Sequence, residues 1–390
     1  MPRKVLCVVG ARPNFIKIAP LLTSMRRHPD SFEAVLVHTG QHYDTSMSGA
    51  FFAQLGLPDP EIHLGVGPGS HAEQTGAIMI ALEAVLAETA PDLVLVVGDV
   101  NSTIAAAVVA AKAGIPVAHV EAGLRSFDRR MPEEINRVVT DSLSSYLFVT
   151  EEDGMANLRR EGVDPERTFL VGNVMIDTLI TLLPRIRERR MAAELGLTPG
   201  SYGVVTLHRP SNVDDAAMLR RLVTALGKIA GRLPLVFPAH PRTTARLAAA
   251  GLTGDLVDAG VRLVEPMPYV EFISLAADAR LVLTDSGGIQ EETTMLGVPC
   301  LTLRDNTERP VTVMRGTNRL VGTDPVGAVR AVDESLAGPL ISREPPPFWD
   351  GHAADRIVAI LDELEWRATG QEPAVAAIVA SVGPRAAPTA

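Results

Sequence analysis

Short, unbroken runs of Val, Leu and Ile recur along this chain and alternate with segments of helical period. A strand that is apolar at every position is buried on both faces, as in a parallel sheet covered by helices. Helical patterns at Glu73–Leu86 and Asp214–Ile229 lie between such runs. The alternation predicts an α/β fold with doubly wound parallel sheets. The expected strands are Lys4–Val9, Ala34–Thr39, Leu93–Gly98, Val117–Glu121, Tyr146–Val149, Thr168–Val171, Gly203–Leu207, Leu235–Ala239, Val261–Val264, Leu281–Asp285 and Cys300–Leu303.

The length of 390 residues predicts two domains. Before the second set of strands, a charged helical pattern ends in Pro199 and Gly200, which is typical of a linker. We expect a first domain at 1–172, a helix and linker at 173–199 and a second domain at 200–345. An amphipathic helix within 346–368 is expected to pack back on the first domain. The Ala- and Pro-rich stretch 369–390 is expected to be disordered.

Composition excludes several classes of protein. The formal net charge is −10, which argues against broad binding to nucleic acid or anionic membranes. Cys7 and Cys300 each lie in an apolar run, so neither a disulfide scaffold nor a cysteine metal site is expected. No apolar stretch reaches the about 18 residues of a membrane span, and the start MPRKVLCVVG lacks a secretory pattern. We therefore expect a cytoplasmic protein.

Ligands of open α/β sheets bind at the carboxyl ends of strands, so polar residues there are the candidates for function. TDSGGIQEE runs from a strand into a helix, and its Ser286, Gly287 and Gly288 suit a phosphate cradle at a helix N-terminus. The alternative is an ordinary helix cap by Asp285 or Ser286. Glu292, about one turn later, is either a ribose ligand or a solvated helical glutamate.

An acidic chain that binds an anion needs local positive charge. In GARPNFIK, Arg12 and Lys17 flank a second turn from strand to helix, and an arginine placed there can fork onto phosphate. Arg209 and Arg319 are further candidates. A surface position is the alternative for Lys17.

Three carboxylates fall at loop positions of the first domain. Asp99 lies in GDVNST, Glu121 in HVEAGLRS and Glu133 in MPEEINR, and such groups around one cleft can transfer protons at carbon. The structural alternative for Asp99 is a cap of the helix that opens at Asn101 or Ser102, and for Glu133 it is a first-turn helix glutamate after Pro132. Glu121 has the weakest alternative, because an idle carboxylate at the end of an apolar strand is costly when buried. His208 and His240 each end a strand of the second domain.

Several familiar motifs are absent. GVGPGS at 65–70 has the wrong spacing for a dinucleotide fingerprint, and the chain has no P-loop, HExxH or GxSxG motif. The histidines and acids show no helical metal-ligand spacing. We therefore expect neither nicotinamide nor ATP chemistry, and no metal.

Taken together, these motifs resemble the non-hydrolysing UDP-N-acetylglucosamine 2-epimerase family. The matching pieces run in order from residue 10 to residue 322: GARPNFIKIAPL, TGQHYD, GDVNST, HVEAGLRS, MPEEINRVVTD, GNVMID, TLHRPSN, PAHPRT, TDSGGIQEE, VPCLTLRDNTERP and GTNRLVG. The resemblance implies two Rossmann-like domains facing a cleft, the glycosyltransferase-B architecture. It also implies a UDP-sugar substrate, no cofactor and a homodimer.

The resemblance also implies roles for individual residues. Asp99, Glu121, Glu133 and His208 would form the catalytic group. The diphosphate would lie on Ser286, Gly287 and Gly288, the ribose on Glu292, and the uracil near Tyr269 or Phe272. The remaining UDP-binding residues would be Arg12, Lys17, Arg137, Arg209, His240, Arg309 and Arg319.

The implied reaction eliminates UDP to give 2-acetamidoglucal and adds UDP back with the opposite configuration at carbon 2. Alternatives are a hydrolysing epimerase that gives ManNAc and UDP, an epimerase of another UDP-acetamido sugar, and a nucleotide-sugar binding protein without turnover. Two residues depart from the family pattern: Asn14 replaces a common glutamate, and Pro210 replaces an arginine. The stretch GVGPGSHAE offers only His71 as a basic group, so we expect no activation by substrate.

Overall fold

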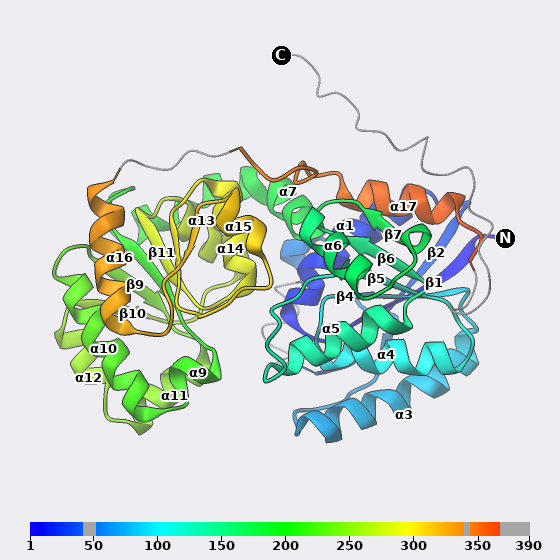
Figure 1. Ribbon diagram of the computed structural model, residues 1–390, viewed down its shortest axis with the longest axis horizontal. Coiled ribbons are helices and arrows are strands. Elements are labelled where there is room, and N and C mark those ends of the chain that lie inside the picture. Colours follow the sequence, from blue (N-terminus) through cyan, green and yellow to red (C-terminus); the bar gives the residue numbers. More distant parts are fainter. Residues whose placement is uncertain (42–51, 339–343, 367–390) are drawn as a thin grey trace, which may run out of the picture. The chain divides into compact units, whose positions relative to one another are not determined.

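The computed structural model describes residues 1–41, 52–338 and 344–366, and the chain divides into two units (Figure 1). Unit 1 comprises Met1–Ile180 and Pro347–Ala390, and unit 2 comprises Thr181–Pro346. The chain thus leaves unit 1, forms unit 2 and returns. The division falls inside α7 (Val174–Arg189), within the stretch 173–199 expected to join the domains.

Unit 1 contains a parallel sheet in the order β3-β2-β1-β4-β5-β6-β7. Every residue of β4 is buried, as its sequence LVLVV predicts. Three helices lie side by side along the sheet, in the order α3, α4 and α5 (Figure 1). The strands are β1 (Arg3–Val9), β2 (Phe32–His38), β3 (Ile62–His63), β4 (Leu93–Val97), β5 (Val117–Ala122), β6 (Tyr146–Val149) and β7 (Thr168–Leu170). The helices are α1 (Arg12–Arg26), α3 (His71–Thr89), α4 (Asn101–Lys112), α5 (Pro132–Leu143), α6 (Glu152–Arg160) and the 3-10 turn Pro165–Arg167.

Unit 2 contains a second parallel sheet, in the order β10-β9-β8-β11-β12-β13. Its strands are β8 (Gly203–Thr206), β9 (Leu235–Pro238), β10 (Val261–Val264), β11 (Leu281–Thr284), β12 (Cys300–Thr302) and β13 (Asn318–Leu320). The helices are α8 (Met191–Glu194), α9 (Pro210–Val213), α10 (Ala216–Ala230), α11 (Pro241–Ala249), α12 (Thr253–Asp258), α13 (Tyr269–Ala277), α14 (Gly287–Leu296), α15 (Pro310–Met314) and α16 (Pro325–Ala337).

Both faces of the unit 2 sheet are buried, which explains its unbroken apolar runs. Val205 packs in one apolar cluster with Leu226 of α10 and Val332 of α16. Its neighbour Val204 packs in a different cluster with Leu275 of α13. Successive residues of one strand therefore enter opposite layers. The predicted fold class, α/β with two doubly wound parallel sheets, is confirmed.

After Pro347 the chain returns to unit 1 and forms α17 (Ala353–Glu363), which packs against α1 (Figure 1). Ser24 of α1 donates a hydrogen bond to Asp355 Oδ1 at 2.8 Å, and Arg3 of β1 donates one to the Leu364 carbonyl at 3.0 Å. The chain's end is therefore tied to the first strand and packs beside the first helix of unit 1. The stretch 369–390 lies outside the described residues, and none of the described helices is long and apolar enough to cross a membrane.

Each sheet has one point where the strand order reverses. In unit 1 it lies between β1 and β4, and in unit 2 between β8 and β11. The crevice at such a point, outside the carboxyl ends of the strands, is where open α/β sheets bind ligands. Arg12 and Asp99 follow β1 and β4, while His208 and Ser286 follow β8 and β11. The sequence candidates therefore gather at both switch points.

Candidate active site

In unit 1, the side chain of Glu121 is placed by a break in the regular pairing of β5. The register of β5 with β6 shifts between Val120 and Ala122, and Glu121 between them has a φ of +75°. A β-bulge redirects a side chain, and a non-glycine residue in the left-handed region is strained by about 1–3 kcal/mol. Strain of this kind gathers at functional sites, so Glu121 is a strong candidate for chemistry.

Glu121 forms an ion pair with Lys17 of α1, and both side chains are almost fully buried. The residue that follows β4 also lies close to this pair. A Cβ on Gly98 would lie 3.0 Å from the Lys17 Nζ atom. Gly98 has a φ of +68°, a backbone conformation that favours glycine. The sequence placed Lys17 beside a phosphate. In the structure its partner is a carboxylate, and its contact with phosphate stays a prediction.

The turn between β1 and α1 is held by Asn14. Its Oδ1 atom accepts hydrogen bonds from the backbone N–H groups of Gly10, at 3.2 Å, and Ala11, at 3.0 Å. Its Nδ2 atom donates to the Val97 carbonyl at 2.8 Å and so joins this turn to the end of β4. An ionised glutamate has no hydrogen to donate to a carbonyl. The departure at Asn14 therefore has a structural explanation. Arg12 is half-buried at the start of α1.

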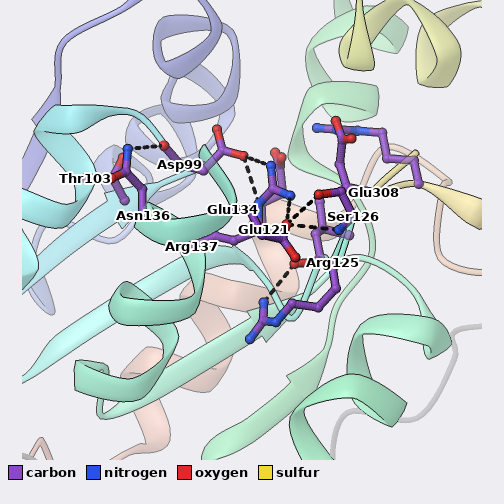
Figure 2. Close-up of polar contacts among 12 residues, drawn as sticks. Asp99, Thr103, Glu121, Arg125, Ser126, Glu134, Asn136, Arg137 and Glu308 are labelled. Atoms are coloured by element: carbon purple, nitrogen blue, oxygen red, sulfur yellow. Dashed lines mark hydrogen bonds and ion pairs between the residues drawn. The ribbon is translucent and has the colours of Figure 1, made fainter. Parts of the chain in front are cut away.

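Asp99 is held by Arg137 of α5, which also binds Glu134 (Figure 2). The Arg137 Nε atom lies 3.1 Å from Asp99 Oδ2, and its Nη1 atom lies 2.5 Å from Glu134 Oε2. Asn136 of the same helix donates to the Asp99 backbone carbonyl at 2.9 Å. Asp99 does not cap α4, because the N-cap residue is Val100. Two predicted residues, Asp99 and Arg137, are thus brought together.

The adjacent glutamates of α5 have different surroundings. Glu134 is buried and accepts hydrogen bonds from the Ser126 N–H and hydroxyl, both at 2.9 Å, and from the Phe127 N–H at 2.8 Å. Glu133, in the same first turn, is half-buried. Glu134 therefore fixes the preceding loop, which leaves Glu133 as the acid–base candidate. Sequence reasoning missed Glu134, although its spacing of three residues to Arg137 is a helical ion-pair signal.

In unit 2, Asp285 organises the loop after β8. Its carboxylate accepts hydrogen bonds from the backbone N–H groups of His208, at 3.1 Å, and Arg209, at 2.9 Å, and from Asn212 Nδ2 at 3.0 Å. The His208 Nδ1 atom lies 3.3 Å from Asp285 Oδ1. The helix-cap alternative for Asp285 is therefore wrong: this side chain belongs to the neighbouring strand's loop.

The two predicted histidines of unit 2 lie together. The ring centroids of His208 and His240 are 5.9 Å apart. The His240 Nδ1 atom accepts a hydrogen bond from the Arg242 N–H at 3.2 Å, so this ring caps α11. Both rings reach the surface, since 41% of the His208 side chain is exposed and His240 is also exposed.

The segment Ser286-Gly287-Gly288 leads into α14 as predicted. Ser286 is the N-cap residue, yet its side chain forms no capping bond among the described residues. A Cβ on Gly287 would lie 2.6 Å from Glu308 Oε1 and 2.7 Å from Arg309 Nη1, so that glycine permits a close approach. Arg309 is buried and paired with Glu291 and Glu308. The positive end of α14 and the nearby guanidinium suit an anion.

Comparison with known proteins decides what this arrangement belongs to. The family model described as UDP-N-acetylglucosamine 2-epimerase matches residues 23–362. The UDP-N-acetylglucosamine 2-epimerase of Methanocaldococcus jannaschii is 42% identical over 92% of this chain and 98% of its own length. The chain belongs to the UDP-N-acetylglucosamine 2-epimerase family. The crystal structure of the M. jannaschii enzyme in complex with UDP-GlcNAc and UDP matches with a TM-score of 0.86, covering 92% of this chain and 99% of that one.

Two further epimerases extend the comparison. The structure of the Neisseria meningitidis UDP-GlcNAc 2-epimerase bound to UDP-GlcNAc has a TM-score of 0.85 at 31% identity, over 92% of this chain and 99% of that one. The UDP-2,3-diacetamido-2,3-dideoxy-D-glucuronate 2-epimerase of Pseudomonas aeruginosa is 39% identical over 93% of this chain and 100% of its own length. The family membership and two-domain fold expected from the sequence are confirmed.

The remaining residues predicted for the 2-epimerase site lie at varied positions in unit 2. The pKa of Glu292 is raised to about 8, because burial and, less strongly, the Glu291 carboxylate outweigh the lowering by a hydrogen bond with Tyr269. Tyr269 is buried and Phe272 half-buried, both on α13. Arg319 lies on the edge strand β13 and forms an exposed ion pair with Glu334 at 2.6 Å. The nucleotide contacts of these residues stay predictions.

Proposed function

We propose that this chain epimerises UDP-N-acetylglucosamine at carbon 2 to give UDP-N-acetylmannosamine, without a cofactor. The observation that carries the proposal is the strained, buried Glu121, which pairs with Lys17 beside Gly98 next to the unit 1 switch point. Carboxylates held at the carboxyl ends of neighbouring strands suit proton transfer. The M. jannaschii relative was crystallised with UDP-GlcNAc and UDP, which supports the substrate.

The chemistry follows from the substrate. The hydrogen on carbon 2 is weakly acidic, so its removal needs the anomeric C–O bond to break. That bond's electron pair leaves with UDP, the C–H electron pair forms the double bond of 2-acetamidoglucal, and a base takes the proton. Re-addition of UDP to carbon 1 and of a proton to the opposite face of carbon 2 completes the inversion. Asp99, Glu121, Glu133 and His208 supply the acid–base groups in this proposal.

Unit 2 would hold the nucleotide. The α14 N-terminus at Ser286, Gly287 and Gly288 would stabilise the charge that develops on the leaving diphosphate. Glu292 would bind the ribose, with Tyr269 and Phe272 near the uracil. The remaining nucleotide contacts are assigned to Arg12, Lys17, Arg137, Arg209, His240, Arg309 and Arg319.

Proton NMR of the enzyme with UDP-GlcNAc in heavy water tests the proposal. We expect a mixture of both epimers with deuterium at carbon 2. Replacing Asp99, Glu121 or Glu133 by its amide should abolish turnover and leave UDP binding nearly intact. A lack of exchange at carbon 2 would reject the proposed activity, and full activity in all three variants would reject the site.

The P. aeruginosa relative favours one alternative substrate, a UDP-diacetamido uronic acid. The same experiment with that sugar compares the two, and the one with the higher kcat/KM is the substrate. A hydrolysing enzyme would instead release free ManNAc and UDP, and a binding protein would release no product.

The proposal extends to the setting of the reaction. We infer a cytoplasmic homodimer whose product serves cell-surface polysaccharide synthesis, on the basis of the family resemblance. Analytical ultracentrifugation tests the dimer, which requires a species of about twice the 41.5 kDa chain mass.

A further inference from the structure

A buried histidine, His119, lies on β5 two residues before Glu121 and bridges two polar groups. Its ring has no exposed surface. The Nδ1 atom lies 2.6 Å from Asp141 Oδ1, and the Nε2 atom lies 2.8 Å from the Gly98 carbonyl oxygen. Both ring nitrogens are therefore bonded, one to α5 and one to the end of β4.

The carbonyl partner determines the direction of one of these hydrogen bonds. A backbone carbonyl only accepts, so Nε2 carries a hydrogen. The Asp141 Oδ2 atom also receives Arg125 Nη1 at 2.7 Å and the Gly123 N–H at 3.1 Å. Burial by itself would raise the pKa of Asp141, but His119 and Arg125 outweigh burial and lower it. The carboxylate thus has three polar partners: the Nδ1 side of His119, Arg125 and the Gly123 N–H.

His119 is therefore fixed at both ends, since Nε2 donates to a carbonyl and Nδ1 faces a carboxylate. Asp141 lies between His119 and Arg125, and Arg125 is paired in turn with Glu161 at 2.6 Å. Such a fully satisfied buried network rigidifies the groups it joins. Turning the ring would leave a buried carbonyl and a buried carboxylate without this partner, which is costly.

The group that His119 holds is the peptide that precedes Asp99. Gly98 has a left-handed φ, and glycine gives this peptide freedom to rotate. The Gly98 N–H donates to the Val120 carbonyl at 3.0 Å, and Asn136 binds the Asp99 carbonyl. These two bonds hold the peptides on either side, whereas the Gly98 carbonyl belongs to the Gly98–Asp99 peptide itself, so the bond from His119 holds that peptide directly. Rotation of that peptide would move the Asp99 carboxylate.

We infer that His119 is a positioning residue for Asp99, acting through the hydrogen bond from its Nε2 atom to the Gly98 carbonyl. Strand β5 then supplies two groups. One is the carboxylate of Glu121, and the other is His119, the donor that orients the Asp99 carboxylate after β4. The kinetic part of this inference rests on the proposed epimerase activity.

Two variants test the contacts of the two ring nitrogens separately. His119→Gln retains a donor near the Nε2 position, whereas His119→Asn retains one near Nδ1 only. We expect the Asn variant to lose about 100-fold in kcat and the Gln variant about threefold, since displacing a catalytic group by 1 Å costs about that much. The KM and the Kd for UDP should change little in both, because Asp99 acts in the chemical step. Equal kcat values in the two variants would overturn the inference.

Two measurements decide the inference without any activity. Nitrogen-15 NMR of the wild-type histidine rings should find hydrogen on Nε2 of His119, and an Nε2 atom without hydrogen would overturn the inference. Crystal structures of both variants should place the Asp99 carboxylate as in the wild type for Gln and displaced for Asn. An unmoved carboxylate in both would also overturn it. If the wild-type enzyme fails to epimerise, the proposed function is wrong, and these two measurements still decide the positioning role.

Discussion

The ammonium group of Lys17 and the carboxylate of Glu121 form an ion pair beneath the carboxyl edge of the unit 1 sheet, where 6% and 2% of their side chains are exposed. The pair joins α1 to the bulge of β5. Two charges buried this deeply are stable only together, because each alone would have to leave water without a partner.

Removing one partner of this pair should destabilise the protein. We expect Lys17→Met to lower the free energy of unfolding by about 3–5 kcal/mol, since it leaves an uncompensated buried charge. Lys17→Met combined with Glu121→Gln should lose less than the sum of the two single changes. Urea denaturation measures all three variants. As a control, Arg319→Met breaks the exposed pair with Glu334 and should cost about 0–1 kcal/mol. Additive losses in the double variant would contradict the coupling.

The adjacent glutamates of α5 should separate activity from stability. Glu134→Gln disturbs a buried group that holds Arg137 and the Ser126 loop, so we expect a loss of about 3 kcal/mol or more in unfolding free energy. Glu133→Gln alters a half-buried side chain and should leave the melting temperature nearly unchanged while turnover falls. Thermal unfolding and the NMR assay together test the pair. Reversed results would exchange the two roles.

Glu292 should make stability depend on pH. The carboxyl group has a pKa of about 8 in the folded protein, against an ordinary value of 4.5, mainly because of burial. Below 4.5 both states hold the proton. As the pH rises from about 4.5 to about 8, the unfolded state releases its proton while the folded state keeps it, so this group's contribution to stability is lost.

The variant Glu292→Gln removes that pH dependence. We expect its unfolding free energy, relative to wild type, to increase as the pH rises through this window and to level off above it. Chemical denaturation at several pH values measures the difference. The exposed Glu265→Gln should follow the wild type. A constant difference between the Glu292 variant and wild type would show that the carboxyl group titrates normally.

The attachment of α17 should depend on Asp177. Its two carboxylate oxygens accept the backbone N–H groups of Ala353, at 3.2 Å, and Ala354, at 2.7 Å, at the start of that helix. Asp177→Ala should cost about 1–2 kcal/mol, as for loss of a helix cap, and speed proteolysis between 347 and 363. Asp177→Asn keeps one acceptor oxygen and should lose less. Limited proteolysis and thermal unfolding check both variants, and equal losses would assign the effect to packing instead.

Most of the fold could be predicted from the sequence, because the central strands are unbroken apolar runs. LVLVV of β4 is buried at every residue, as its composition requires. The two strands that the sequence did not predict, Ile62–His63 and Asn318–Leu320, lie at sheet edges. They are two and three residues long, and neither forms an apolar run. Their pairing comes from the neighbouring strand, so local sequence carries little of it.

A site residue could be predicted where its own place in the sequence carries the signal. It could not be predicted where its role depends on how two elements pack. Glu121 stood out because a carboxylate ended an apolar strand. Its partner Lys17 did not, since that pairing depends on the alignment of α1 with β5. Asp285 belonged in sequence to the start of α14, yet it binds the loop after β8 because β8 and β11 are neighbours in the sheet.

The division of unit 1 into two segments has a consequence for how the protein is made. Unit 2 is continuous and can complete its own core once Pro346 has left the ribosome. The face of α1 that α17 covers must wait for the segment after Pro347, although α1 itself is translated before unit 2. During synthesis, that apolar face is open to chaperones and to aggregation for longer than any surface of the unit that begins later.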